Sequence, residues 1–175
     1  DGGGLRNAIP REANVEVAVT DLVGFKAHVS AMADKLSAEF KNIEPNMRIE
    51  VSEVPCPAEV MPLTAQQNTL AALMAMPNGV YRMSPDMEDL VETSSNLARV
   101  VVASGHFEMH SLQRSSVEST KDEIAAAVRS VFRLMGADVT HSGSYPGWKP
   151  NPNSAITELL VQKYRQQFQE EPQVV

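Results

Sequence analysis

The fold is decided by one stretch of the chain, Val91-Glu92-Thr93-Ser94-Ser95-Asn96-Leu97-Ala98-Arg99-Val100-Val101-Val102-Ala103-Ser104-Gly105-His106-Phe107-Glu108-Met109-His110-Ser111-Leu112. It contains two runs that are typical of β-strands, separated by the turn residues Ser104 and Gly105. Two strands joined by so short a turn form an antiparallel hairpin. The stretch therefore predicts strands over residues 91–103 and 106–112, paired through a tight turn.

The segment before this hairpin begins with a predicted strand, helix and strand. Three valines alternate with polar residues over residues 13–20, which is the pattern of a half-buried strand. Asp21 is suited to the N-cap of a helix whose apolar residues recur at spacings of three and four as far as Phe40. Alternation returns over residues 47–54, so a second strand is expected there.

Two further helices flank the hairpin. Residues 63–76 predict the first, and Pro77-Asn78-Gly79 predicts a turn after it. Thr120 and Glu123 have the spacing of a capping box for the second, which Gly136 is suited to end. The residues expected on its buried side are Ile124, Val128, Val131 and Leu134.

The last part of the chain predicts a strand over residues 137–144 and a final helix that begins at Asn153 or Ser154. The order β-α-β-α-β-β-α-β favours an α+β fold, with an antiparallel or mixed sheet and helices on one face, in a ferredoxin-like arrangement. Residues 173–175 look like the opening of another strand. We therefore expect the chain to continue beyond Val175.

Composition excludes several functions. The 175 residues include 15 Lys and Arg against 22 Asp and Glu, a net charge of -7, and no basic cluster that could grip a phosphate backbone. The apolar stretches are too short for a membrane-spanning helix. A single cysteine, Cys56, excludes an intramolecular disulfide and fits a reducing compartment. We expect a cytoplasmic protein that binds neither nucleic acid nor membrane.

No complete catalytic or metal-binding motif is found in the sequence. The histidines form no His-Glu-x-x-His pattern, and no cysteine pair exists. Glu108 and His110 share one face of a predicted strand, and they are interpreted either as two metal ligands or as an ordinary strand pair. Residues 2–4, three glycines, precede a strand and not a helix, which indicates a flexible lead-in and no phosphate loop. The residues alone predict an α+β domain without a self-sufficient active site.

Five separated stretches carry a resemblance to a known family. They are Gly2-Gly3-Gly4-Leu5-Arg6-Asn7-Ala8-Ile9-Pro10-Arg11-Glu12-Ala13, Pro77-Asn78-Gly79-Val80, Val91-Glu92-Thr93-Ser94-Ser95-Asn96-Leu97, Arg114-Ser115-Ser116 and Tyr145-Pro146-Gly147-Trp148-Lys149-Pro150. In this order and spacing they are similar to the aminoacylhistidine dipeptidases, the carnosine-cleaving bacterial branch of the co-catalytic zinc aminoacylase and carboxypeptidase family. The resemblance covers nearly the whole chain.

The resemblance implies a division of labour. Residues 1–150 would form the substrate-covering lid and dimerisation domain, and residues 151–175 the first helix of the returning catalytic domain. The whole protein would be a cytoplasmic, homodimeric dipeptidase that hydrolyses Xaa-His-type dipeptides. Its two zinc ions and catalytic residues would lie outside this chain, which alone would bind no metal and would be inactive.

Two residues match positions that the resemblance places at the substrate. Asn7 would hydrogen-bond the bound dipeptide through its amide, and Arg114 would pair with the dipeptide carboxylate through two parallel bonds. Without the resemblance, Asn7 is interpreted as a turn residue that bonds its own backbone. Arg114 is likewise interpreted as a solvated charge at the end of a strand.

Three more residues are candidates for a cleft or a domain hinge. His110 has the same strand parity as Arg114 and would face the same side. Tyr145 and Trp148 would line the cleft or, because prolines flank them, pack into a stiff and well-buried hinge.

The sequence leaves a second interpretation open. A stand-alone, non-enzymatic α+β module that senses a ligand or mediates dimerisation would share the predicted elements and the lack of a metal-ligand set. The two interpretations differ in whether the reading frame continues past Val175 into segments that carry histidines and glutamates.

Overall fold

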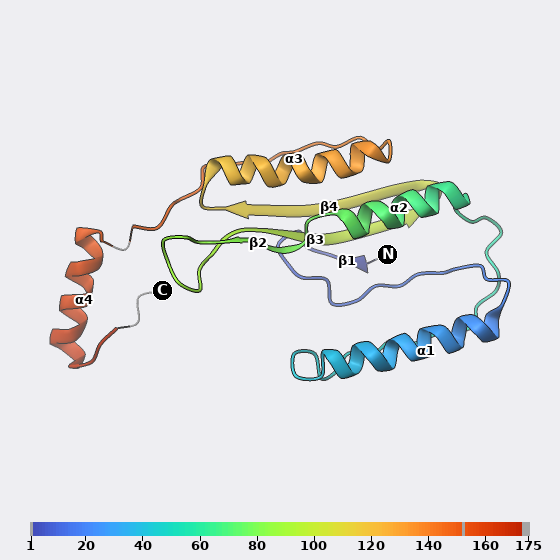
Figure 1. Ribbon diagram of the computed structural model, residues 1–175, viewed down its shortest axis with the longest axis horizontal. Helices are drawn as coiled ribbons and strands as arrows, with labels where there is room; N and C mark the ends of the chain where they lie inside the picture. Colours follow the sequence, from blue (N-terminus) through green and yellow to red (C-terminus); the bar gives the residue numbers. More distant parts are fainter. Residues whose placement is uncertain (1, 152, 173–175) are drawn as a thin grey trace. The chain divides into compact units, whose positions relative to one another are not determined.

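The predicted α+β class is confirmed in the computed structural model, which describes residues 2–151 and 153–172 (Figure 1). The helices are α1 (Leu22–Glu39), α2 (Leu63–Ala75), α3 (Glu118–Leu134) and α4 (Ala155–Phe168), and the strands are β1 (Gly2–Gly3), β2 (Gly79–Met83), β3 (Val91–Ala103) and β4 (His106–Ser115). The strand expected to open at residues 173–175 lies outside the described residues.

β3 is the central strand of an antiparallel sheet and pairs with each of the other three strands. β4 follows one of its edges over residues 93–103. Because that edge is occupied, β2 and β1 share the opposite edge, where β2 pairs with residues 91–95 and β1 with Arg99 and Val100 (Figure 1). Each part of β3 thus has a partner on at least one side.

The predicted hairpin between β3 and β4 is confirmed. Ser104 and Gly105 both have positive φ angles, 52° and 76°, as a two-residue turn of this kind requires. β4 is longer than predicted, since it continues past Leu112 to Ser115. The extension includes Arg114.

Helices α2 and α3 cover one face of the sheet, as expected. Ala72 of α2 and Met76, the residue after that helix, pack with Val128 and Phe132 of α3 in the buried core. Phe107 of β4 joins them through a stacked contact with Phe132, with ring centroids 6.0 Å apart. Leu97 of β3 and Met109 of β4 pack against the same cluster. Since side chains alternate along a strand, the neighbouring residues of β3 and β4 point away from the helices.

A buried carboxylate ties β2, β3 and α3 together. Glu92, 8% exposed, accepts hydrogen bonds from the hydroxyls of Thr93 and Thr120 at 3.3 and 3.1 Å. The Nη1 atom of Arg82 lies 3.9 Å from the same Glu92 oxygen, and its Nη2 lies 3.4 Å from Glu123. A buried charge is costly unless it is paired and hydrogen-bonded. These partners meet that requirement.

This network explains why the predicted capping box is wrong. α3 begins at Glu118, and its N-cap, Val117, makes no side-chain capping bond. Thr120 therefore lies within the first turn, 1% exposed, with its hydroxyl turned to Glu92. Ile124 and Val128 are buried as expected, but Leu134, in the last turn, is 89% exposed.

The other predicted helix ends are confirmed. Asp21 caps α1 by accepting from the Gly24 N–H at 2.9 Å, and Ser154 caps α4. Gly136 ends α3 with a φ of 86°, while the Ala137 N–H donates to the Phe132 carbonyl, which is the Schellman arrangement.

The strands predicted over residues 13–20, 47–54 and 137–144 do not form. Within these ranges only Ala13 makes a β-bridge, to Gly2. Alternating apolar residues show which side chains could face a core, but a strand also needs a partner for its N–H and C=O groups. None of the three segments has such a ladder in the described part of the chain.

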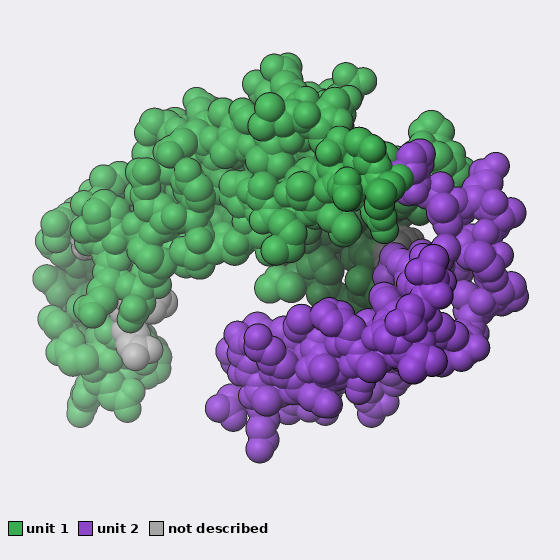
Figure 2. Space-filling view, turned by 45° about the vertical axis from the view of Figure 1, so that its right-hand side comes forward, with its two compact units in different colours: residues 1–14, 63–175 green, residues 15–62 purple. Residues whose placement is uncertain are grey.

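The described chain divides into two compact units, residues 15–62 and the remainder (Figure 2). Within the first, Lys26 of α1 lies 2.5 Å from Glu53, and this hydrogen bond and charge lower the pKa of the Glu53 carboxyl. No residue of α1 is buried, although apolar residues recur in its sequence at spacings of three and four. None of the described helices has the length and apolarity needed to cross a membrane.

The interpretation of residues 2–4 as a flexible lead-in is wrong, because Gly2 and Gly3 form β1. Gly3 has a φ of 81°, and a Cβ at this position would lie 1.9 Å from the Ala98 carbonyl oxygen. Gly2 and Gly3 pair with Val100 and Arg99 of β3. Glycine therefore permits both the backbone angle and the close approach of the two strands.

We expect Gly3→Ala to lower the free energy of unfolding by about 2 kcal/mol or more, since it adds a positive-φ penalty to a backbone clash. Gly4→Ala is the matched control, because a Cβ at Gly4 meets nothing within 4 Å. Urea unfolding of both variants measures the difference. Equal stability of the two variants would contradict the described β1–β3 pairing.

Candidate functional site

Asn7 lies at the tip of a loop that leaves β1 and returns to it. At the base of the loop, the Gly3 N–H donates to the Glu12 carbonyl at 3.2 Å, and Gly2 bridges Ala13. At the tip, the Ala8 N–H donates to the Leu5 carbonyl at 3.1 Å, which closes a turn over residues 5–8, the Asn7 turn. The Asn7 side chain is exposed. The turn predicted for Asn7 is thus present, and no hydrogen bond joins its side-chain amide to another described residue.

The Asn7 turn is fastened to the sheet by Asn96 of β3. The Nδ2 atom of Asn96 donates to the Arg6 carbonyl at 3.0 Å and to the Ala8 carbonyl at 2.8 Å, on either side of Asn7. Asn96 belongs to one of the matching stretches, but its contact with the Asn7 turn was not predicted. A polar amide in the middle of a strand, on the face opposite the helices, was the available signal.

Arg114 lies on the same face of the sheet as Asn96. It pairs with Ser94, whereas Asn96 pairs with Leu112, so Arg114 and Asn96 are diagonal neighbours. Such neighbours are about 7–8 Å apart in antiparallel sheets. Arg114 is exposed, and no hydrogen bond or ion pair is found between its guanidinium and the described residues. The sheet therefore brings Arg114 close to the strand position that holds the Asn7 turn.

His110 shares this face but is already paired. Its Nε2 atom lies 2.6 Å from the Oε1 atom of Glu108, the partner expected from their spacing. Of the described residues, no three histidine, cysteine, aspartate or glutamate side chains come together as a metal site. The Glu108–His110 pair alone supplies too few ligands for a zinc ion.

Tyr145 and Trp148 lie on the surface of this chain, with side chains that are 75% and 86% exposed. Their packing into a domain hinge, or their place in a cleft, stays a prediction. The segment that carries them is held by its backbone instead: Lys121 donates to the Tyr145 carbonyl at 2.8 Å, and the Gly147 N–H donates to Glu118 at 2.5 Å. Both rings are left on the surface.

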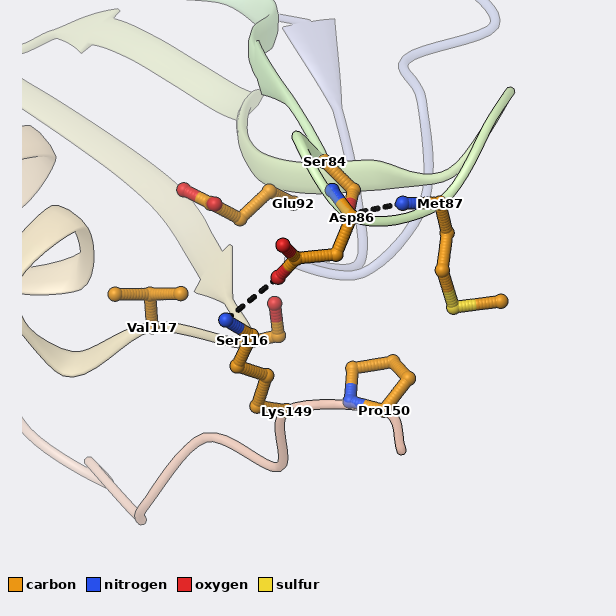
Figure 3. Close-up of a pocket in the computed structure, with 8 residues that line it drawn as sticks. All are labelled: Ser84, Asp86, Met87, Glu92, Ser116, Val117, Lys149 and Pro150. Atoms are coloured by element: carbon orange, nitrogen blue, oxygen red, sulfur yellow. Dashed lines mark hydrogen bonds and ion pairs between the residues drawn. The ribbon is translucent and has the colours of Figure 1, made fainter. Parts of the chain in front are cut away.

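The same segment, residues 145–149, is also attached near the ends of β3 and β4. Lys149 lies 2.6 Å from Asp86, and Figure 3 shows the two side chains pointing toward each other. A Cβ at Gly147 would lie 2.7 Å from the Ser115 carbonyl oxygen, so glycine is needed for this approach. Because Ser115 follows Arg114, the segment lies beside the end of β4 that carries the arginine.

An open groove follows the edge of β4 that faces away from β3 and is lined by residues from both faces of that strand. Its walls include Arg6, His110, Arg114, Tyr145 and Trp148, together with one side of α3. Of the five candidate residues predicted from the sequence, the groove is lined by all but Asn7. Arg6, the residue before Asn7, also lines it. The exposed guanidinium of Arg114 gives this groove a cation that can pair with a small anionic ligand.

Comparison with known proteins confirms the resemblance seen in the sequence. The chain is 34% identical over 176 residues to the cytosol non-specific dipeptidase of Escherichia coli (strain K12), covering 99% of this chain and 36% of that protein. The chain is similar to one part of a dipeptidase. It thus spans about a third of the length of the curated relative it matches.

A solved structure shows the same kind of similarity. The aminoacylhistidine dipeptidase of Vibrio alginolyticus superposes with a TM-score of 0.91 and 36% identity, over 99% of this chain and 36% of that one. No family model matches the sequence. The dipeptidase similarity therefore extends over the whole described fold, including the sheet that carries Asn96 and Arg114.

We expect the 145–149 segment to loosen in acid. Hydrogen bonds from Lys121 and the Gly147 N–H lower the pKa of the Glu118 carboxyl from its usual 4.5. A lowered pKa means that the contact stabilises the segment at pH values above the ordinary pKa. This stabilisation is lost as the pH falls through the lowered pKa. The anisotropy of Trp148, the single tryptophan, should therefore drop below pH 4.5.

The control for this titration is Glu118→Gln, which removes the titrating carboxyl. Its anisotropy should already be low at neutral pH and should lack the acid transition. A transition that survives in Glu118→Gln would assign the change to another group.

Proposed function

We propose that residues 1–150 form the substrate-covering lid of a dipeptidase, with residues 151–175 as the first helix of the returning catalytic domain. The observation that carries the proposal is the similarity over 99% of the chain to about a third of two dipeptidases. The absence of a three-ligand metal cluster among the described residues is compatible with a lid. The alternative of a stand-alone sensing or dimerisation module gains no comparable support.

The lid would act by binding the dipeptide carboxylate through Arg114. A guanidinium without a partner among the described residues is suited to a carboxylate, because two parallel N–H donors match its two oxygens. Asn7 would hydrogen-bond the same ligand through its amide. Held at both ends, the substrate would present its scissile bond to the catalytic domain, and longer peptides would be excluded.

The chemistry would be supplied elsewhere in the whole protein. We infer a metal-dependent hydrolase of Xaa-His-type dipeptides, with two zinc ions and their ligands outside this chain, acting as a cytoplasmic homodimer. The name of the Escherichia coli relative, which is a cytosol dipeptidase, supports the location and the reaction class. His110, Tyr145 and Trp148 would form the rim of the lid groove.

In the full-length protein, Arg114→Ala should lower kcat/KM for dipeptides by about 2 kcal/mol or more, the magnitude of a lost charge-assisted hydrogen bond. Steady-state hydrolysis assays measure this effect. Arg133→Ala is the matched control, because Arg133 is an exposed arginine at the end of α3, outside the lining of the groove. An Arg114→Ala protein as efficient as the control would refute the carboxylate clamp.

The 175-residue chain alone should bind no stoichiometric zinc and hydrolyse no dipeptide, since its described residues offer no three-ligand cluster. Elemental analysis after dialysis and a carnosine hydrolysis assay test both points. Dipeptidase activity that a chelator abolishes would show that the chain carries its own catalytic site.

A further inference from the structure

The direction of the Asn7 side chain depends on how its turn is held. The base of the loop is fixed by the two residues of β1, but residues 4–11 between base and tip are exposed. A tip without a further attachment would rotate about its base, because exposed loop backbone is mobile unless hydrogen bonds restrain it. The bonds from the side chain of Asn96 supply this restraint.

We propose that Asn96 is a positioning residue for substrate binding. Its carboxamide fixes the two peptide units that flank Asn7 and so sets the direction in which the Asn7 amide points. This inference rests on the proposed function, in which Asn7 contacts the dipeptide. It adds a residue whose effect on the substrate passes entirely through Asn7.

The chemistry of the contact requires an amide. Both bonds start from the single Nδ2 atom of Asn96, which carries two N–H groups, and end on the carbonyls of Arg6 and Ala8 at 3.0 and 2.8 Å. One bond would allow the turn to pivot, whereas two bonds on either side of Asn7 fix both its place and its rotation. Aspartate has the same shape but presents only acceptors to these carbonyls.

The location of Asn96 adds to the effect. It lies on the central strand, and it is the diagonal neighbour of Arg114. The two proposed substrate contacts, Asn7 and Arg114, are thereby held in place by one rigid pair of strands. Binding groups keep their relative geometry best when rigid elements hold them, and small displacements of such groups are costly for rate.

The test is Asn96→Asp in the full-length protein, assayed with a dipeptide both alone and combined with Asn7→Ala. We expect Asn96→Asp to lower kcat/KM about tenfold, on the order of one or two lost hydrogen bonds. The change should fall on the same parameter, KM or kcat, as that caused by Asn7→Ala. In the Asn7→Ala background, Asn96→Asp should have no further effect, since the side chain it positions is gone.

Asn78→Asp is the matched control for the added charge. Asn78 also meets β3, but its Oδ1 atom accepts a hydrogen bond from the Leu97 N–H, and aspartate keeps that acceptor. The control should retain the parent kcat/KM. Asn96→Ala, which removes the donors without adding charge, replaces Asn96→Asp if the latter fails to fold.

The outcomes separate this inference from the proposed function. If Asn7→Ala lowers kcat/KM but Asn96→Asp does not, or if the two effects simply add, Asn96 does not position Asn7 and the inference is overturned. If Asn7→Ala leaves kcat/KM unchanged, both the Asn7 contact and the inference fail. The carboxylate clamp is then judged separately by Arg114→Ala.

Discussion

The hydrogen bonding of β3 is the constraint on which the rest of the structure depends. One edge of this strand is filled by β4, whereas the other is divided between two short strands, β2 and β1. Between them, at Leu97, the backbone N–H has no strand partner on that side and is satisfied by the side chain of Asn78 at 2.8 Å. A strand edge left without such a partner would expose unpaired donors. Polar side chains thus complete the sheet where the strands end.

This arrangement explains why the five matching stretches of sequence occur together. Residues 2–13 contact residues 91–97 through Asn96, and residues 77–80 contact the same strand through Asn78. Residues 91–97 pair with residues 114–116, where Ser94 lies opposite Arg114. Residues 114–116 are in close contact with residues 145–150 at Gly147, where no Cβ would fit. Stretches that are scattered along the chain are therefore consecutive contacts around one end of a sheet.

The extent to which sequence predicted the fold follows from how local each signal is. The hairpin turn at Ser104 and Gly105, the cap at Asp21 and the helix end at Gly136 depend on neighbours in the chain, and all were predicted. β1 was missed because a pair of glycines becomes a strand only when the Ala98 carbonyl lies against it. The expected strands at residues 13–20 and 47–54 show the converse, since alternation without a partner does not make a ladder.

In the candidate site, too, local features were predicted and contacts between distant residues were not. The turn at Asn7 and the exposure of Arg114 agree with the sequence analysis, but their common anchor, Asn96, depends on a contact with residues far away in the chain. Trp148 is exposed within this chain, where backbone contacts to Glu118 and Lys121 hold its segment without using the ring. Composition and proline content alone do not reveal such contacts.

The contact between Asn96 and the Asn7 turn also has a consequence for the order of folding. β3 and β4 are adjacent in the chain and need only a two-residue turn to meet, whereas Asn96 lies 90 positions from Arg6 and 88 from Ala8. Closing a long loop costs more conformational entropy than closing a short one, so contacts between distant residues form late. We expect the hairpin to be complete before the Asn7 turn docks. The surface that meets a ligand would then be among the last parts of the sheet to acquire its native geometry.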